Sequence, residues 1–288
     1  MDFRTDLAIE KFEALPQTSV KGVSTDVVTH KDVRITKINI FSESGEESTG
    51  KPQGKYITAE IPPLTKFSVT DEDLICTLGQ QLASLLPESG LVLTVGLGNE
   101  NITPDALGPR SCSVILATRH ISGELAESVG LGNLRPSAVL APGVLGQTGV
   151  ETSEIIKGLV RTLNPSAVIV IDALAARRLS RLGCTVQMAD SGIVPGSGVG
   201  NSRSAINIDT LGVPVISVGV PTVVDALTLV NDITGSDASS HPNLKENMII
   251  TSREIDLVID RASKLVGMTI NKALQPHISV DEMMMLMD

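Results

Sequence analysis

The sequence predicts an α/β protein with a mostly parallel sheet that is covered by helices on both faces, and with a β-rich hairpin region at its N-terminal end. Four short runs of Val, Ile, Leu and Ala recur from residue 91 onward, and most are followed by a loop and a helical pattern. Strands buried on both faces are apolar along their whole length, and parallel neighbours need crossover helices. A chain of 288 residues suits one large domain of this class.

The first part, residues 5–69, is predicted to be rich in β-structure. The segment VVTHKDVRITKINIF, residues 27–41, alternates apolar and polar side chains, and GKYITAEIP, residues 54–62, resumes an extended pattern. Between them, SESGEESTGKPQG has the composition of a turn. We therefore expect a hairpin formed by the two extended segments.

An amphipathic helix is predicted next, over residues 71–86. Thr70 and Asp73 have the spacing of a capping box at its start, and Pro87 ends it. One face of this helix carries the apolar side chains Leu74, Ile75, Leu78, Leu82, Leu85 and Leu86.

The α/β core is expected over residues 91–235, with right-handed crossovers. Its apolar runs are LVLTVGLG (91–98), SAVLAPG (137–143), SAVIVID (166–172) and VPVISVGVP (213–221), with the less apolar CTVQMAD (184–190) before the last. Helices are expected at PRSCSVILATRHI (109–121) and ALAARRLSRL (173–182). A last helix is predicted over residues 251–275, with Thr251 and Glu254 as its capping box. The Met-rich tail SVDEMMMLMD is assigned no function.

Composition excludes several classes of partner. The net charge is −10, whereas binding to nucleic acid or to an anionic membrane surface needs a basic face. The three cysteines are far apart in sequence, which favours reduced thiols. No apolar segment reaches the roughly 18 to 20 residues of a membrane span. We therefore expect a soluble cytoplasmic protein with no direct nucleic-acid or membrane partner.

Two acids follow apolar runs, and reacting groups in open parallel sheets gather beyond the carboxyl ends of the strands. Asp105 follows the first run in the sequence ITPDALGPR. As the second residue of a helix it would only complement the helix dipole. Pro109, however, favours a helix that starts later and leaves Asp105 in an irregular loop.

Asp172 closes the third apolar run and has the same ambiguity. It can cap a following helix, or it can be a carboxyl at the edge of a buried environment, where the pKa of an acid rises. Two such acids on neighbouring strand ends can share a proton: the ionised one deprotonates water while the protonated one polarises a carbonyl. Asp105 and Asp172 are therefore the candidate catalytic pair.

The Gly-rich run SGIVPGSGVGNSR, residues 191–203, has two interpretations that the sequence leaves open. It can cradle a phosphate, although it lacks the lysine of a P-loop and the dinucleotide fingerprint. It can also let the backbone approach a neighbouring element or an extended peptide closely. The candidate substrate-binding residues are Asp190, Ser191, Gly192, Gly196 and Gly198. The four histidines form no zinc-binding pair, so neither a metal nor another cofactor is predicted.

Four long blocks resemble the germination protease family of spore-forming bacteria. They are GLGNENITPDALGPR, APGVLGQTGVETSEII, VIDALAARRLSRLGCTVQMADSGIVPGSGVGN and LGVPVISVGVPTVVDA, in this order. The resemblance implies a fold similar to that of hydrogenase maturation proteases. It also implies a homotetrameric endopeptidase that degrades small acid-soluble spore proteins in the spore core. Its atypical aspartic mechanism would use Asp105 and Asp172 together and need no cofactor.

The same resemblance implies a zymogen that cleaves itself before a TDLA-type sequence. The bond would join Arg4 to Thr5, so that residues 1–4 are a propeptide and residues 5–288 the peptidase domain. TDLAIE also resembles an acidic cleavage motif in the substrate proteins.

Two alternatives from other classes stay open on sequence grounds. One is a metal-dependent maturation peptidase, in which Asp105, Asp172 and Asp190 ligate a divalent cation. The other is a non-proteolytic module that holds an anion in the loop from Gly192 to Gly200.

Overall fold

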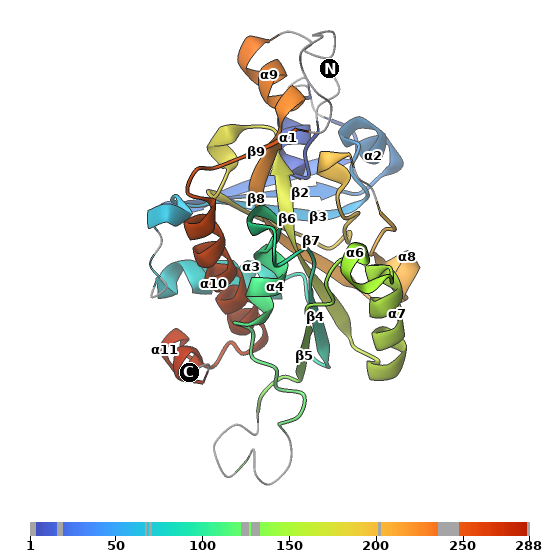
Figure 1. Ribbon diagram of the computed structural model, residues 1–288, viewed down its shortest axis with the longest axis vertical. Coiled ribbons are helices and arrows are strands. Elements are labelled where there is room, and N and C mark those ends of the chain that lie inside the picture. Colours follow the sequence, from blue (N-terminus) through green and yellow to red (C-terminus); the bar gives the residue numbers. More distant parts are fainter. Residues whose placement is uncertain are drawn as a thin grey trace.

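A nine-stranded sheet forms the centre of the molecule, in the order β1-β2-β3-β7-β8-β6-β4-β5, with β9 paired to β8 (Figure 1). The computed structural model describes residues 4–15, 20–66, 68, 71–121, 127, 133–200, 203–235 and 248–286. The strands are β1 (Val23–His30), β2 (Val33–Ile40), β3 (Gly54–Glu60), β4 (Val92–Gly96), β5 (Ser137–Leu140), β6 (Ala167–Ala176), β7 (Thr185–Ala189), β8 (Val215–Asp225) and β9 (Ile249–Thr251).

Helices flank this sheet. The α-helices are α1 (Ala8–Glu13), α2 (Glu43–Thr49), α3 (Glu72–Ala83), α4 (Leu107–Cys112), α6 (Leu145–Thr148), α7 (Thr152–Leu163), α8 (Ile208–Leu211), α9 (Ala226–Thr234), α10 (Ile255–Leu274) and α11 (Val280–Met285). Short 3-10 turns are η1 (Leu64–Lys66), η2 (Thr103–Asp105), η3 (Leu179–Arg181) and η4 (Ser197–Val199).

The predicted fold class is confirmed, and the parallel part of the sheet is the run β8-β6-β4-β5. The strands β1, β2, β3 and β7 extend it with antiparallel pairs. The N-terminal hairpin region and the α/β core therefore share one continuous sheet. The less apolar run at 184–190 supplies β7, where the antiparallel part meets β8.

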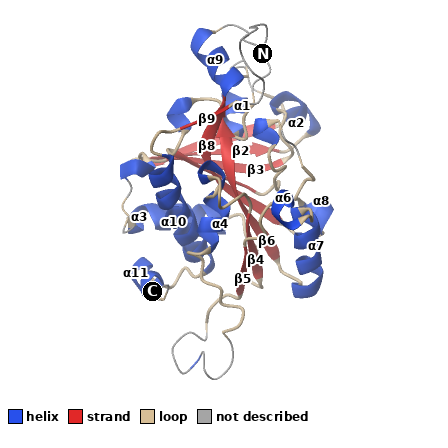
Figure 2. Cartoon of the chain, in the orientation of Figure 1, coloured by secondary structure: helices blue, strands red, loops and turns tan. Residues whose placement is uncertain are grey.

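Both faces of the parallel part are covered, as the apolar runs predicted. Ile169 and Ile171 of β6 pack in the cluster that includes α3 and α10, whereas Val168 and Val170 pack in the cluster that includes α7. Figure 2 shows α3, α4 and α10 on one side of the sheet and α6, α7 and α8 on the other. Alternate residues of one strand thus serve opposite layers, which requires an apolar strand.

The N-terminal hairpin differs from the prediction in its boundaries. Residues 27–41 contain a turn rather than one long strand, because Lys31, at φ 51, reverses the chain between β1 and β2. β2 and β3 do pair antiparallel, as expected. The predicted turn between them contains α2, since Ser42 caps it by accepting from the Gly45 amide and Gly50 ends it at φ 64.

The predicted helix at 71–86 is present as α3. Its cap is Asp71, whose carboxylate accepts from the Leu74 amide at 3.1 Å, rather than the predicted Thr70–Asp73 box. Thr70 lies outside the described residues. Asp73 instead forms an exposed ion pair with Lys31.

The helix predicted over residues 109–121 is wrong beyond its first turn, because α4 runs from Leu107 to Cys112. Pro109 lies within the first turn, where a backbone donor is not needed. Beyond α4 the buried side chain of Asn271 on α10 satisfies two backbone groups. It accepts from the Leu116 amide at 2.8 Å and donates to the Val114 carbonyl at 2.9 Å. Tertiary contacts therefore replaced the expected helical bonds.

The helix predicted over residues 173–182 is also wrong, because β6 continues through Asp172 to Ala176. Ala175 exchanges hydrogen bonds with Asp6, its amide donating to the carboxylate at 2.8 Å and its carbonyl accepting from the Asp6 amide at 2.9 Å. On the other side β6 stays paired to β8, across a bulge after Leu174. Partners on both sides hold the segment extended.

The C-terminal helix is present as α10, without the predicted capping box. Thr251 belongs to β9, and Glu254 precedes the helix without a side-chain cap. The Met-rich tail forms α11, capped by Ser279. None of the described helices combines the length and apolar character that a bilayer crossing needs.

Candidate active site

Asp105 lies at the end of η2, in the connection between β4 and α4. Its Oδ2 accepts from the Asn99 amide at 2.7 Å, and the Thr222 hydroxyl of β8 donates to the Pro104 carbonyl at 2.8 Å. Gly98 makes this turn possible, because at φ +110 an added Cβ would lie 2.0 Å from the Asp105 carbonyl oxygen. The acid is therefore held beside the strand end and outside α4.

Asp172 lies within β6, opposite Gly219 of β8. Only 8% of its surface is exposed, and its Oδ1 accepts from the Ala173 amide at 2.9 Å. It caps no helix, so the alternative interpretation of this residue is wrong. Burying an ionised carboxyl in the middle of a sheet costs free energy, which favours its protonated form.

The two acids line the same cavity, the dyad cavity, which has a volume of about 510 Å³. Asp105 reaches it from the turn after β4 and Asp172 from β6, the next strand in the sheet. The other charged residues in its wall are Asp6, Glu151 and Arg203. The cavity thus joins two carboxyls that are far apart in sequence, although Asp172 lies inside β6 and not at its end, where the sequence predicted it to lie.

The surroundings of the two acids are unequal. Burial raises the pKa of Asp172 well above its usual range, and the negative charges of Asp6 and Asp105 raise it further. The Ala173 amide and Arg203 act against this rise. Burial also raises the pKa of Asp105, which is less deeply buried, while the Asn99 amide and Arg203 lower it. Asp172 is therefore the better holder of a proton, and Asp105 the better base.

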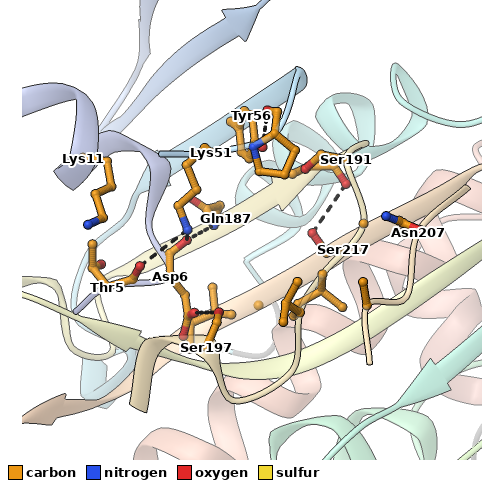
Figure 3. A pocket seen from close by; sticks show the side chains of 18 of the residues that line it. Thr5, Asp6, Lys11, Lys51, Tyr56, Gln187, Ser191, Ser197, Asn207 and Ser217 are labelled. Carbon is orange, nitrogen blue, oxygen red and sulfur yellow. Dashed lines mark hydrogen bonds between the residues drawn. The ribbon is translucent and has the colours of Figure 1, made fainter. Parts of the chain in front are cut away.

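The structure divides the predicted substrate-binding residues. Gly196 lines the cavity of Asp105 and Asp172, whereas Ser191 and Gly192 line a second cavity of about 410 Å³ (Figure 3). Gly198 packs so closely that an added Cβ would lie 2.3 Å from Asp6 Oδ2. Asp190 lines neither cavity, and its carboxylate accepts from the Lys55 amide at 2.6 Å.

Several amides of the Gly-rich loop donate within the protein. The amides of Ile193, Ser197, Gly200 and Arg203 each donate to a backbone carbonyl, of Ile206, Val194, Ser197 and Pro195 respectively. These four amides are therefore not free to donate to an anion. Close approach to a neighbouring element, the second interpretation of this loop, agrees with the contact between Gly198 and Asp6.

The metal-site alternative also lacks its third ligand. Asp190 is outside the cavity of Asp105 and Asp172, and across the part of the chain that the structure describes no three His, Cys, Asp or Glu side chains gather closely enough to hold an ion.

Arg4 and Thr5, the predicted cleavage position, lie beside this site and not in it. The Arg4 guanidinium is 3.6 Å from the Asp225 carboxylate, and the buried Thr5 hydroxyl donates to Glu10 at 2.5 Å. Both residues line the second cavity. In this arrangement the bond between them is away from the two acids.

Sequence reasoning missed Asp6 and Arg203. Asp6 lines both cavities, and Arg203 is the one cation in the wall of the dyad cavity among the residues described. Local pattern gave no signal for either residue.

Comparison with known proteins gives a consistent set of relatives. A family model described as germination protease matches residues 5–235. A germination protease of Caldanaerobacter subterraneus subsp. tengcongensis is 40% identical over 100% of this chain and 98% of its own length. One of Clostridium acetobutylicum is 38% identical over 97% of each chain, and one of Priestia megaterium is 44% identical over 80% of this chain and 65% of its own. Among solved structures, a nickel–iron hydrogenase maturation protease of Thermococcus kodakarensis is similar with a TM-score of 0.37 and 14% identity, covering 66% of this chain and 98% of that one.

Proposed function

Because the chain belongs to the germination protease family, a family of peptidases, we propose that it is an endopeptidase that cuts small acid-soluble spore proteins with a water held between Asp105 and Asp172. The observation that carries this proposal is the shared cavity, which joins these two acids in unequal surroundings.

Each acid has a separate part in the reaction. Ionised Asp105 takes a proton from the water, whose oxygen attacks the carbonyl carbon of the substrate. Protonated Asp172 donates a hydrogen bond to the carbonyl oxygen as negative charge develops there. The C–N bond then breaks, and the leaving amine takes the proton that Asp105 accepted. Both acids return to their starting protonation states.

The Gly-rich loop supports an extended substrate beside the dyad. Gly196 lines the dyad cavity, while Ser191 and Gly192 line the neighbouring one, and Asp6 forms part of the wall of both. A peptide that follows the loop would therefore pass from one cavity to the other. Asp190, which lines neither, is left out of this path.

The test compares Asp105→Asn and Asp172→Asn with Asp209→Asn, a control that removes an exposed carboxylate on α8. Cleavage of a purified small acid-soluble spore protein is followed with and without a chelator. We expect kcat/KM of each dyad variant to fall by about 10²-fold or more, since general acid and base catalysis raises a rate by about 10² to 10⁴-fold. The control and the chelator should leave the rate unchanged.

Two results would contradict this function. Full cleavage by both dyad variants would remove Asp105 and Asp172 from the mechanism. Loss of activity in chelator, restored by added metal, would favour the metal-dependent peptidase.

We also propose that the chain processes itself between Arg4 and Thr5, works in the spore core and assembles as a homotetramer, as its family membership suggests. The match to the family model begins at Thr5. Because the Arg4–Thr5 bond lies outside the dyad cavity, cleavage requires Arg4 to leave Asp225 and Thr228, which it contacts here.

A further inference from the structure

We propose that Asp6 is a positioning residue of the catalytic dyad, a third carboxylate whose negative charge keeps the shared proton on Asp172. This inference rests on the proposed function. It assigns a part in the chemistry to the N-terminal segment, which the sequence connects only with processing.

The main chain of Asp6 is fixed from two directions. Its amide donates to the Ala175 carbonyl of β6 at 2.9 Å. Its carbonyl accepts from the Lys51 amine at 2.9 Å and from the side-chain amide of Gln187 at 3.0 Å. Figure 3 shows Lys51 and Gln187 converging on the main chain of Asp6 from the side opposite Ser197. These bonds set the position of the residue independently of its side chain.

The side chain is fixed as firmly. One carboxylate oxygen accepts from the Ala175 amide at 2.8 Å, and the other accepts from the Ser197 hydroxyl of the Gly-rich loop at 2.8 Å (Figure 3). Gly198 closes over it, with no room for a Cβ. Ala175 is three residues beyond Asp172 on β6, so Asp6 is attached to the strand that carries the proton donor. Both bonds are of the kind that a carboxylate accepts.

The charges around Asp172 come from several elements. Asp6 of the N-terminal segment, Asp105 of η2, Glu151 before α7 and Arg203 of the loop before α8 line the same cavity as Asp172. Asp6 exerts the largest of the charge effects on the pKa of Asp172, ahead of Asp105, and both raise it. Arg203 opposes them with a smaller effect.

Cations lie on the other side of Asp6, in the second cavity. Lys51 donates to the Asp6 carbonyl, and Lys11 and Arg4 also line this cavity. Burial lowers the pKa of Lys51. Neither lysine lines the dyad cavity, so neither positive charge lies in the wall that Asp6 shares with Asp172.

This arrangement gives Asp6 a distinct chemical part. Like charges close together cannot all be ionised without cost, so a fixed charge at Asp6 favours the protonated form of Asp172. Protonated Asp172 is the form that polarises the substrate carbonyl. Removing the charge of Asp6 should therefore move the pH at which activity is lost, and not only lower the rate.

The test is the pH profile of kcat/KM for Asp6→Asn, again with Asp209→Asn as the control. Asparagine keeps the shape: its oxygen can accept from the Ala175 amide while its amide donates to the Ser197 hydroxyl. We expect the alkaline limb to move to lower pH by at least about half a unit in Asp6→Asn and not in the control. Asp6→Ala, which is smaller, should show the same shift if asparagine does not fit.

The outcomes are distinct. If the alkaline limb of both Asp6 variants lies at the same pH as that of the control, while Asp172→Asn stays inactive, the proposed role of Asp6 is overturned. Cleavage by Asp172→Asn would instead overturn the proposed function. A limb that moves only in the Asp6 variants supports the inference, because a merely structural role would lower the rate at every pH.

Discussion

Asp172 is a carboxyl in surroundings that disfavour its ionised form. It lies within an apolar strand, its exposure is 8%, and its one protein donor within hydrogen-bonding distance in the described structure is the amide of Ala173. A buried carboxyl of this kind favours the neutral form. The strand can therefore carry the acid, provided that it stays protonated.

This residue predicts a pH dependence of stability. The pKa of Asp172 is higher in the folded protein than in the unfolded chain. The contribution of protonated Asp172 to the free energy of unfolding is therefore fully present below the unfolded pKa, about pH 4. That contribution is lost as the pH rises through the folded pKa. We expect the midpoint of thermal unfolding to fall across this range in the unchanged protein and to fall less in Asp172→Asn.

The control is Asp209→Asn, whose carboxylate is exposed. It should keep the slope of the unchanged protein. Equal slopes in Asp172→Asn and in the unchanged protein would mean that Asp172 titrates as an ordinary acid.

At the scale of elements, the N-terminal segment and α1 are joined to the strand β6 and to the turn that follows it. Glu10 of α1 accepts from the amides of Arg177 and Arg178 at 2.6 and 3.0 Å, and the Thr5 hydroxyl donates to the same carboxylate. Its carboxylate is also 3.5 Å from the buried guanidinium of Arg181. The carboxylate of Glu10 therefore ties the start of the chain to the turn that follows β6.

We predict that Glu10→Ala destabilises the fold by about 3 kcal/mol, because it leaves the amides of Arg177 and Arg178 without their acceptor. Arg181 keeps its ion pairs with Glu13 and Glu60, at 2.8 and 3.1 Å. The measurement is urea unfolding, with Glu47→Ala, an exposed position on α2, as the control. Protease digestion should also cut the N-terminal segment faster in Glu10→Ala. A free energy of unfolding within about 0.5 kcal/mol of the control would show that these contacts contribute little.

At the scale of the whole molecule, the segment after the proposed cleavage position is part of the core. Leu7, Ala8 and Ile9 are buried against β2, β3, β6 and β8, and the cluster they join is separate from the two that cover the parallel strands. The side chain of Arg4 by contrast is half exposed, and its guanidinium is 3.6 Å from the buried carboxylate of Asp225. Of the residues that cleavage between Arg4 and Thr5 would release, the structure describes Arg4, and its loss would leave the cluster of Leu7, Ala8 and Ile9 in place.

We predict that the mass of the purified protein shifts, under processing conditions, to that of a chain beginning at Thr5, and that the shorter form unfolds within a few degrees of the longer one. We expect the loss of Arg4 to cost about 1 kcal/mol, because its side chain is half exposed and Asp225 keeps the hydrogen bonds from the Thr228 amide and hydroxyl at 3.0 Å. Asp172→Asn should keep residues 1–4. An unchanged protein that always retains them would count against self-processing.

The sequence by itself determined the fold class and most strand positions, and it selected Asp105 and Asp172 as the proposed dyad. These follow from local properties: apolar runs predict buried strands, and the ends of parallel strands meet at one edge of a sheet. Asp105 and Asp172 could be selected because each follows such a run. Their shared cavity agrees with that selection.

Only the tertiary structure decided what lies around the dyad. The segment ALAARR reads locally as a helix, yet Asp6 and β8 bond it on both sides and keep β6 extended to Ala176. Asp6 reaches the site from 166 positions before Asp172, and the Gly-rich loop contacts it through Ser197 and Gly198. Long-range hydrogen bonds outweigh local propensity at these positions, and no local pattern records which distant residue will supply them.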